Sequence, residues 1–142
     1  MRQQDSILLG DDELDALEAM GGVLRKAGYQ VTQAGNAAQA LEAMKRREFA
    51  TVVTDLRMPG MSGEELLARI LELYPDTNVI VLTGYGSIQS AVEAMKKGAA
   101  DYITKPCIGD ELLVALERCL KARRLERENR FLRRELARGP AR

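Results

Sequence analysis

Five short apolar runs alternate along this chain with longer segments in which apolar residues recur at helical spacing. The runs are ILLG at 7–10, YQVTQA at 29–34, TVVT at 51–54, NVIVLT at 78–83 and DYIT at 101–104. The helical spacing between them is carried by Leu14, Leu17, Met20 and Leu24, by Ala37, Leu41 and Met44, by Leu66, Leu67, Ile70 and Leu71, and by Ile88, Ala91, Val92 and Met95. Because a helix must carry the chain back before each new strand, the strands are predicted to be parallel and covered on both faces. The pattern predicts a doubly wound α/β fold with five parallel strands.

Composition supports one compact body. The 142 residues with 46% hydrophobic content fit a single domain with a core and exclude the class of disordered proteins. No apolar run reaches membrane-spanning length, and the amino terminus holds acids where a signal peptide needs basic residues, so we expect a soluble, cytoplasmic protein that makes no membrane contact. Cys107 and Cys119 form no CxxC pair and are expected to be free thiols.

The charge balance changes near Arg118. Residues 1–117 hold 11 Lys/Arg against 18 Asp/Glu, whereas residues 118–142 hold 10 against 3. Such a shift is typical of a globular body followed by a segment of another kind. We therefore predict a folded domain over 1–120 and a helical extension over 121–142.

Acidic, hydroxyl and amine side chains stand where the predicted strands end. Asp11 and Asp12 follow the first strand, Asp55 the third, Thr83 ends the fourth and Lys105 follows the fifth. In an open parallel sheet, ligands bind beyond the carboxyl ends of the strands. Three carboxylates in one crevice repel one another and favour a hard divalent cation, for which Mg2+ is the natural candidate.

Lys105 and Thr83 would suit an anion held against that metal, and a phosphoryl group fits. Asp55 could then act as a nucleophile that forms an acyl phosphate. Each residue alone has a plainer explanation: Asp11 and Asp12 could be acids favoured at a helix amino terminus, Asp55 a turn residue and Lys105 a solvated loop lysine. The functional hypothesis rests on the conjunction of four strand ends.

These residues and their neighbours resemble the receiver domain of two-component response regulators, the CheY family. The resemblance covers roughly residues 5 to 120 and is carried by DD at 11–12, TDLRMPGMSG at 54–63, LTGYGS at 82–87 and DYITKP at 101–106. It implies a flavodoxin-like, CheY-like (βα)5 fold with strand order 2-1-3-4-5. It also implies that Asp55 accepts a phosphoryl group from the phosphohistidine of a sensor histidine kinase. The chain contains no histidine, so that donor must be another protein.

The resemblance assigns further roles around Asp55. Mg2+ would be held by Asp11, Asp12, Asp55 and the backbone carbonyl of Arg57. Thr83 and Lys105 would bind the phosphoryl oxygens. Thr83 would also move towards the phosphate, with Tyr102 turning inward as the aromatic switch. The Lys105–Pro106 peptide bond would be cis.

Within the family, TDLRMPGMSGEELL and LTGYGSIQSAVEAMKKGAADYITKP look most like receivers of the NtrC and DctD group, which precede a sigma-54-dependent ATPase and a DNA-binding domain. This chain has no GxxxxGK[ST] phosphate loop, so it does not contain the ATPase itself. A regulator with a non-DNA output, such as a cyclic-dinucleotide enzyme, is the alternative to an NtrC-like effector. An aspartyl-nucleophile phosphohydrolase would need a second acid where Arg57 stands. A flavodoxin-like cofactor binder would need a phosphate loop where GDDE stands. A signalling phosphoacceptor, not an enzyme, is therefore predicted.

The carboxyl-terminal segment is predicted to be one long helix with a dimer seam. No Gly or Pro interrupts residues 110–137, and a heptad places Ala122, Asn129 and Leu136 at a with Leu125 and Leu132 at d. Leucine at d with one asparagine at a favours a parallel two-stranded coil, hence a homodimer. Ten basic residues could instead bind nucleic acid. They interleave with the seam, unlike the separate arm of a basic-region zipper, so direct nucleic-acid binding is not expected.

Overall fold

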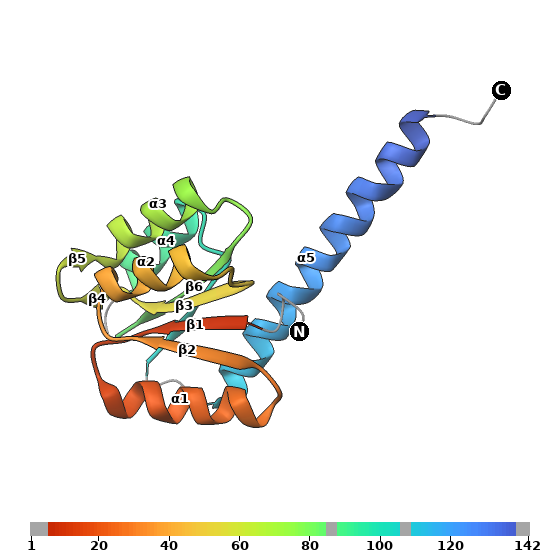
Figure 1. The fold of residues 1–142 in the computed structure, drawn as a ribbon. Coiled ribbons are helices and arrows are strands. Elements are labelled where there is room, and N and C mark those ends of the chain that lie inside the picture. Colours follow the sequence, from red (N-terminus) through yellow and green to blue (C-terminus); the bar gives the residue numbers. More distant parts are fainter. Residues whose placement is uncertain (1–5, 85–87, 106–108, 139–142) are drawn as a thin grey trace.

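The computed structural model describes residues 6–84, 88–105 and 109–138. Figure 1 shows a sheet between two layers of helices and one helix that runs far beyond the sheet. The strands that build the sheet are β1 (Ser6–Gly10), β2 (Gln30–Ala34), β3 (Thr51–Asp55), β6 (Asn78–Thr83) and β7 (Asp101–Thr104). The helices are α1 (Leu14–Lys26), α2 (Ala37–Arg46), α3 (Gly63–Leu73), α4 (Ile88–Lys96) and α5 (Gly109–Arg138).

The strand order confirms the predicted fold. The five strands lie in the order β2-β1-β3-β6-β7, and every neighbouring pair is parallel. The remaining two strands, β4 (Arg57–Met58) and β5 (Met61–Ser62), form a separate antiparallel hairpin, so the order corresponds to the predicted 2-1-3-4-5. The hairpin was not predicted, because two-residue strands are too short to show a periodicity. Gly60 closes it with φ of +91°, a region that glycine adopts without strain.

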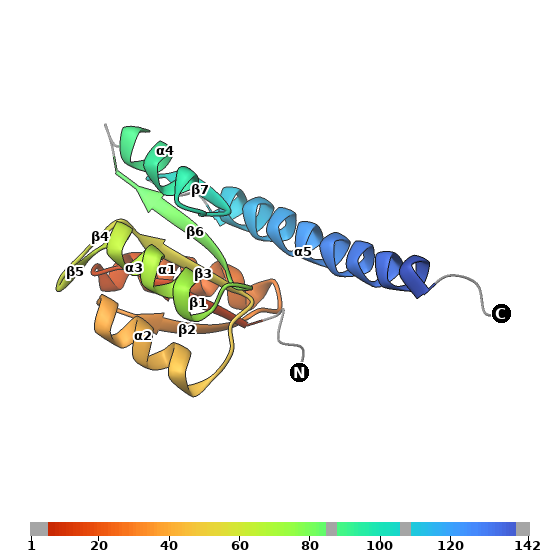
Figure 2. The ribbon, with the colours of Figure 1, turned by 90° about the horizontal axis from the view of Figure 1, so that it is seen from above.

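Alternation along each strand divides the core between the two faces of the sheet. In β1, Leu8 belongs to the cluster with α2, α3 and α4, whereas Ile7 and Leu9 belong to the cluster with α1 and α5. Strands β3 and β6 alternate in the same way, since successive side chains of a strand point to opposite faces. Figures 1 and 2 show the resulting layers, with α1 and α5 on one face and the other helices on the opposite face.

Capping residues set where two of the helices begin. The Asn36 side chain accepts a hydrogen bond from the Gln39 amide at 2.8 Å, and the Ser62 hydroxyl accepts one from the Glu65 amide at 3.1 Å. Both bonds satisfy amides that lack a partner in the first turn of a helix. They place the amino ends of α2 and α3 directly after β2 and the β4–β5 hairpin.

The helical spacing predicted more buried side chains on α4 than the structure contains. Ala91 and Ala94 are buried, but Ile88, Val92 and Met95 are exposed, as is Leu14 at the start of α1. The spacing predicted the helices correctly because it reports a shared face. It could not report which face of a short helix meets the sheet, and in α4 two alanines make that contact.

The long helix is continuous. Its first part packs on the sheet through Leu112 and Leu116, which are fully buried, and Figure 2 shows that the rest projects away from the body. Leu125, Leu132 and Leu136 are exposed on the projecting part. No helix in the described part of the chain is long and apolar enough to cross a membrane. The predicted cis peptide lies outside the described residues, because Pro106 is among those not described.

Candidate functional site

The acids predicted to lie together do so at the carboxyl edge of the sheet. β1 and β3 are neighbours, so Asp11, directly after β1, and Asp55, the last residue of β3, lie side by side. Asp11 is fully buried and Asp55 is 7% exposed, whereas Asp12 is exposed. One carboxylate oxygen from each of the three lies within 4.8 Å of the other two. Such a cluster of negative charge at a buried edge needs a cation.

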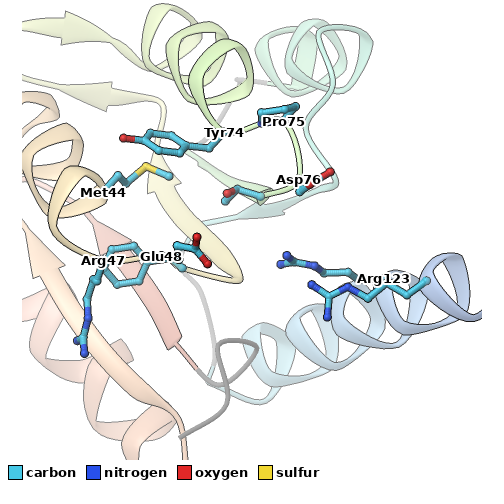
Figure 3. Close-up of a pocket in the computed structure, with 10 residues that line it drawn as sticks. Met44, Arg47, Glu48, Tyr74, Pro75, Asp76 and Arg123 are labelled. Atoms are coloured by element: carbon cyan, nitrogen blue, oxygen red, sulfur yellow. The ribbon is translucent and has the colours of Figure 1, made fainter.

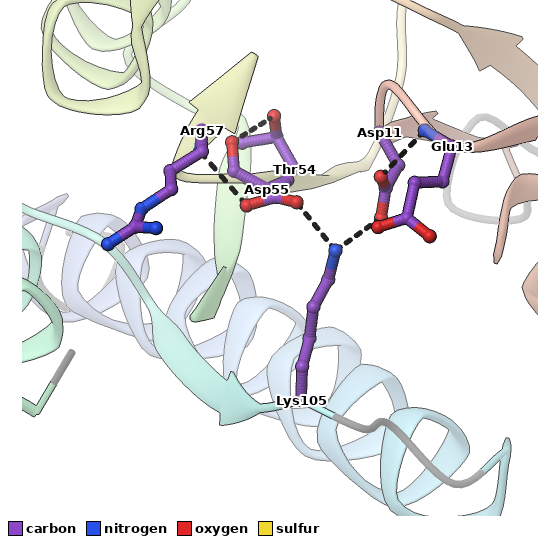
Figure 4. A network of polar contacts seen from close by, with 6 residues as sticks. All are labelled: Asp11, Glu13, Thr54, Asp55, Arg57 and Lys105. Atoms are coloured by element: carbon purple, nitrogen blue, oxygen red, sulfur yellow. Dashed lines mark hydrogen bonds and ion pairs between the residues drawn. The ribbon is translucent and has the colours of Figure 1, made fainter. Parts of the chain in front are cut away.

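Lys105 provides one cation. Its ammonium donates to Asp55 Oδ2 at 2.5 Å and to Asp11 Oδ2 at 2.7 Å, bridging the two carboxylates as Figure 4 shows. Burial by itself lowers the pKa of Lys105, but the hydrogen bonds and charges of Asp11 and Asp55 outweigh it, so the pKa is raised above its usual value. Lys105 is therefore held in its charged form inside the site.

Backbone amides hold the other oxygens of the two acids. The Glu13 amide donates to Asp11 Oδ1 at 3.0 Å, and the Arg57 amide donates to Asp55 Oδ1 at 2.9 Å. Both bonds join an aspartate to the residue two positions later, the pattern of an Asx-turn. Sequence reasoning missed these donors because an amide has no side-chain signature, although aspartate at a strand end is a known signal for this turn. The bonds leave the Oδ2 atoms free for Lys105.

Gly63 closes the loop that carries Arg57. Its amide donates to the Leu56 carbonyl at 2.9 Å. A Cβ at Gly63 would lie 2.3 Å from the Leu56 Cα and 2.6 Å from the Leu56 carbonyl oxygen, both backbone atoms that cannot swing away. Only glycine fits this approach, so the position determines how the residues after Asp55 turn out of the sheet.

Thr83 lies across a small cavity from Asp55. The cavity of about 140 Å³ is lined by both residues and by neighbours that include Arg57, Ser62 and Gly84. Thr83 is buried at the end of β6, and its carbonyl accepts a hydrogen bond from the Lys105 amide at 2.6 Å. Because β6 lies between β3 and β7, it brings the Thr83 hydroxyl and the Lys105 backbone to the same edge as Asp55. The space is of a size for a small oxyanion.

Other predicted site residues lie apart from this cluster. Tyr102, on the edge strand β7, is 40% exposed. The Arg57 side chain is exposed, and the backbone amide of Arg57 is the group that bonds to Asp55. Leu125, Asn129, Leu132 and Leu136 lie on the projecting part of α5.

The acidic cluster fits a hard divalent cation. Three carboxylate oxygens converge, two of them from nearly buried side chains, and oxygen ligands of this type are those that Mg2+ takes in proteins. The Lys105 ammonium occupies the space between Asp11 and Asp55 instead, so a cation there would have to share the two acids with it.

Comparison with known proteins shows which family the chain resembles. A family profile described as "Response regulator receiver domain" matches residues 7–117. The transcriptional regulatory protein DctD of Rhizobium meliloti (strain 1021) is 41% identical over 134 residues, 94% of this chain and 29% of that protein. The regulatory protein ZraR of Klebsiella oxytoca is 39% identical over 87% of this chain and 28% of that protein. The chain thus spans less than a third of the curated relatives it matches.

Solved structures agree with the sequence comparison. The structure of NtrX from Brucella abortus superposes with a TM-score of 0.86 at 35% identity, over 89% of this chain and 29% of that chain. A response regulator receiver domain protein from Clostridium thermocellum superposes with a TM-score of 0.80 at 32% identity, over 84% of this chain and 97% of that chain. The second match covers nearly the whole of that solved receiver domain.

Proposed function

The chain belongs to the response regulator receiver domain family, and on that premise we propose that Asp55 accepts a phosphoryl group from the phosphohistidine of a sensor histidine kinase. The observation that carries the proposal is the contact of the Lys105 ammonium with Asp55, 2.5 Å away, beside the cavity that reaches Thr83. This geometry offers a nucleophile, a positive charge and a hydroxyl around a space for one phosphoryl group.

The transfer would proceed by attack of an Asp55 oxygen on phosphorus. A P–O bond forms as the P–N bond to the kinase imidazole breaks, and the imidazole nitrogen leaves with the electron pair and takes a proton. Lys105 stabilises negative charge on the phosphoryl oxygens, and the Arg57 amide holds the carboxylate oxygen that keeps Asp55 oriented. Asp55 is a phosphoacceptor, and the chain acts on its own side chain, so we propose a signalling domain and not an enzyme with a separate substrate.

We propose Mg2+ as the cofactor, held by Asp11, Asp12, Asp55 and the backbone carbonyl of Arg57. Bound there, the ion would neutralise charge on the acids and on the phosphoryl oxygens. Backbone amides hold the carboxylates of Asp11 and Asp55 in place, and oxygens of the three acids lie within 4.8 Å of one another. This convergence supports the proposed ligand set.

Phosphorylation of Asp55 would be transmitted by a conformational change of Thr83 and Tyr102. Thr83 lines the cavity beside Asp55, so its hydroxyl could bind a phosphoryl oxygen with a small movement. Val81, two residues before Thr83 in β6, pairs with Tyr102 in β7. The neighbouring strands support a coupled change in which Thr83 moves and Tyr102 turns inward.

The output is proposed to pass through the helix after the body. In this proposal residues 1–120 form the receiver, residues 121–142 form a helical extension, and the chain dimerises through Leu125, Asn129, Leu132 and Leu136. DctD and ZraR are named transcriptional regulatory proteins, which supports control of transcription. The resemblance to NtrC and DctD receivers leads us to propose a cytoplasmic protein with a sigma-54-dependent effector. Nucleic acid would be bound by that effector and not by this chain.

Treatment with a small-molecule phosphoryl donor and Mg2+, followed by intact mass measurement, tests the proposal. One phosphoryl adduct is expected on the native chain and none on Asp55→Asn. Asp76→Asn, which removes an acid outside the cluster, is the matched control and should keep the adduct. An adduct that survives Asp55→Asn would overturn the assignment.

A further inference from the structure

The projecting helix is hydrogen-bonded to the sheet at the edge opposite the acidic site. Arg123 Nη1 donates to the Ala50 carbonyl at 3.0 Å. Ala50 comes directly before β3, and the same carbonyl accepts a hydrogen bond from the Asn78 amide at 3.1 Å, at the first residue of β6. The Asn78 side chain in turn donates to the Cys119 carbonyl of α5 at 3.4 Å. These four residues, Ala50, Asn78, Cys119 and Arg123, form what we call the anchor.

Arg123 is the last partly buried residue of α5 among the side chains that the structure describes. Every residue from 124 to 137 is exposed, whereas Arg123 is partly buried. Figure 3 shows the Arg123 side chain reaching from α5 towards the turn that holds Tyr74, Pro75 and Asp76. It lines a cavity of about 330 Å³ between α5 and the body. Beyond the buried residues Leu112, Leu116 and Cys119, Arg123 is therefore the contact nearest to the point where the helix leaves the body.

The charges around Arg123 fit an attachment that can be made and broken. Glu48 and Asp76 line the cavity on the body side, and Arg127 joins Arg123 on the helix side. Burial lowers the pKa of Arg123, as do the charges of Arg127 and Arg130, while Asp76 and Glu48 raise it. Within residues 6–84, 88–105 and 109–138, no hydrogen bond or ion pair satisfies Arg127 or Arg130. Glu48 and Asp76 attract the Arg123 guanidinium, and for residues 120–134 Arg123 makes the one hydrogen bond to the body that the structure describes.

We propose that Arg123 is a positioning residue that sets the direction in which residues 124–138 leave the body, and that it links this direction to β3 and β6. Those two strands begin at the anchor and end at Asp55 and Thr83. The link to phosphorylation rests on the proposed function, whereas the positioning role does not.

The anchor and the predicted dimer seam use different faces of the helix. In the heptad with Leu125 and Leu132 at d, Arg123 occupies position b, on the side of the helix away from the a and d residues. The anchor can therefore be made while two chains pair along the seam. In the proposed link, a change in the position of the Ala50 carbonyl or of Asn78 would favour either the bonded or the released state of Arg123.

Distance measurement between spin labels tests the positioning role. Labels at Glu72→Cys on α3 and Arg133→Cys on α5, both exposed sites, are placed in a Cys107→Ser background and diluted with unlabelled chain so that only distances within one chain are read. In the native chain, the distance between the two labels should show one narrow distribution. Arg123→Ala should make it about twofold broader, because a helix end that loses this hydrogen bond to the body moves more freely.

The controls separate the anchor from a general loss of charge. Arg124→Ala removes the neighbouring exposed arginine and should leave the distribution narrow, and Arg123→Lys, which keeps a donor, should broaden it less than alanine does. An unchanged thermal midpoint would show that Arg123→Ala is folded. If that variant does not fold, Arg123→Gln replaces it in the same measurement. Equal widths for Arg123→Ala and Arg124→Ala would overturn the positioning role.

The same labels test the link to the site. After treatment with a phosphoryl donor and Mg2+, the native distribution should shift, and Arg123→Ala should take up the phosphoryl group by intact mass without that shift. A shift of native size in Arg123→Ala would overturn the link. Absence of any phosphoryl adduct on the native chain would overturn the proposed function instead. The distance distributions of the unphosphorylated native chain, Arg123→Ala and Arg124→Ala would still decide the positioning role.

Discussion

The Lys105 ammonium nitrogen lies 2.5 Å from Asp55 Oδ2. The same nitrogen lies 2.7 Å from Asp11 Oδ2, so one lysine separates two nearly buried acids that would otherwise repel each other. Before any phosphoryl group or metal arrives, Lys105 is thus the internal counterion of the site. The energetic consequences of this contact can be measured without a kinase.

Lys105→Met should destabilise the metal-free protein. The substitution keeps the length of the side chain but leaves Asp11 and Asp55 facing each other, at a cost of about 2 kcal/mol in the free energy of unfolding. Mg2+ should then raise the thermal midpoint more in the variant than in the native chain. Lys97→Met is the control, because Lys97 and Glu64 form a half-exposed ion pair at 3.2 Å and its loss should cost less than about 0.5 kcal/mol. Equal losses for the two variants would contradict the bridging role.

Stability should fall in alkali through Lys105. Since the folded-state pKa of Lys105 is raised above 10.5, the contribution is fully present below that pH and is lost as pH rises through the folded-state value. Urea unfolding of the native chain and of Lys105→Met, compared from about pH 9 upwards, should show a stability difference that narrows above the unfolded-state pKa. A difference that stays constant across this range would exclude the linkage.

Gly63→Ala should disturb the turn after Asp55. The new methyl group would meet the Leu56 backbone at 2.3 Å, so the loop has to shift, and a loss of about 2 kcal/mol is expected together with slower phosphorylation of Asp55. Gly22→Ala is the matched substitution within α1, where nothing lies within 4 Å of the added atom. It should stabilise the chain by about 0.5–1 kcal/mol, because alanine favours a helix interior. Chemical denaturation measures the free energy of unfolding of both variants. A loss in Gly63→Ala no larger than in Gly22→Ala would contradict the close contact with Leu56.

Cys119 should resist thiol reagents while the protein is folded. Burial raises the pKa of its thiol to about 11, and the charge of Asp101 adds to this effect, so the reactive thiolate is scarce near neutral pH. In a Cys107→Ser background, mass spectrometry should find little alkylation in buffer and complete alkylation in denaturant. Rapid modification of the native protein would mean that this part of α5 opens from the sheet.

Leu132→Asp should abolish dimerisation through the projecting helix. The charge would fall in the predicted seam, where apolar side chains from two chains meet. Phe131→Asp is the control, because Phe131 is equally exposed on the same helix but lies at a non-seam position. Sedimentation equilibrium over a range of concentrations should give a monomer for the first variant and a dimer for the second. A native chain that stays monomeric when concentrated and phosphorylated would refute the seam.

Strand and helix periodicities were sufficient to predict the sheet and most of its helices. The family resemblance supplied the strand order, and the absence of Gly and Pro from residues 110–137 predicted the length of the last helix. The periodicities depend on local repetition of apolar residues, which needs no knowledge of neighbours in space. The same local information failed on α4, where Ile88 and Val92 repeat at helical spacing and yet remain exposed. It also missed the β4–β5 hairpin and the close contact of Gly63 with Leu56.

The sequence by itself determined which residues stand at the strand ends, because strand length and chain order place Asp11, Asp55, Thr83 and Lys105 there in any parallel sheet. Only the tertiary structure decided how these residues pair. Lys105 reaches both acids across 94 and 50 residues of sequence, and Arg123 reaches Ala50 across 73. Such contacts depend on the packing of β7 beside β6 and of α5 across the sheet, and no local pattern in the chain records them.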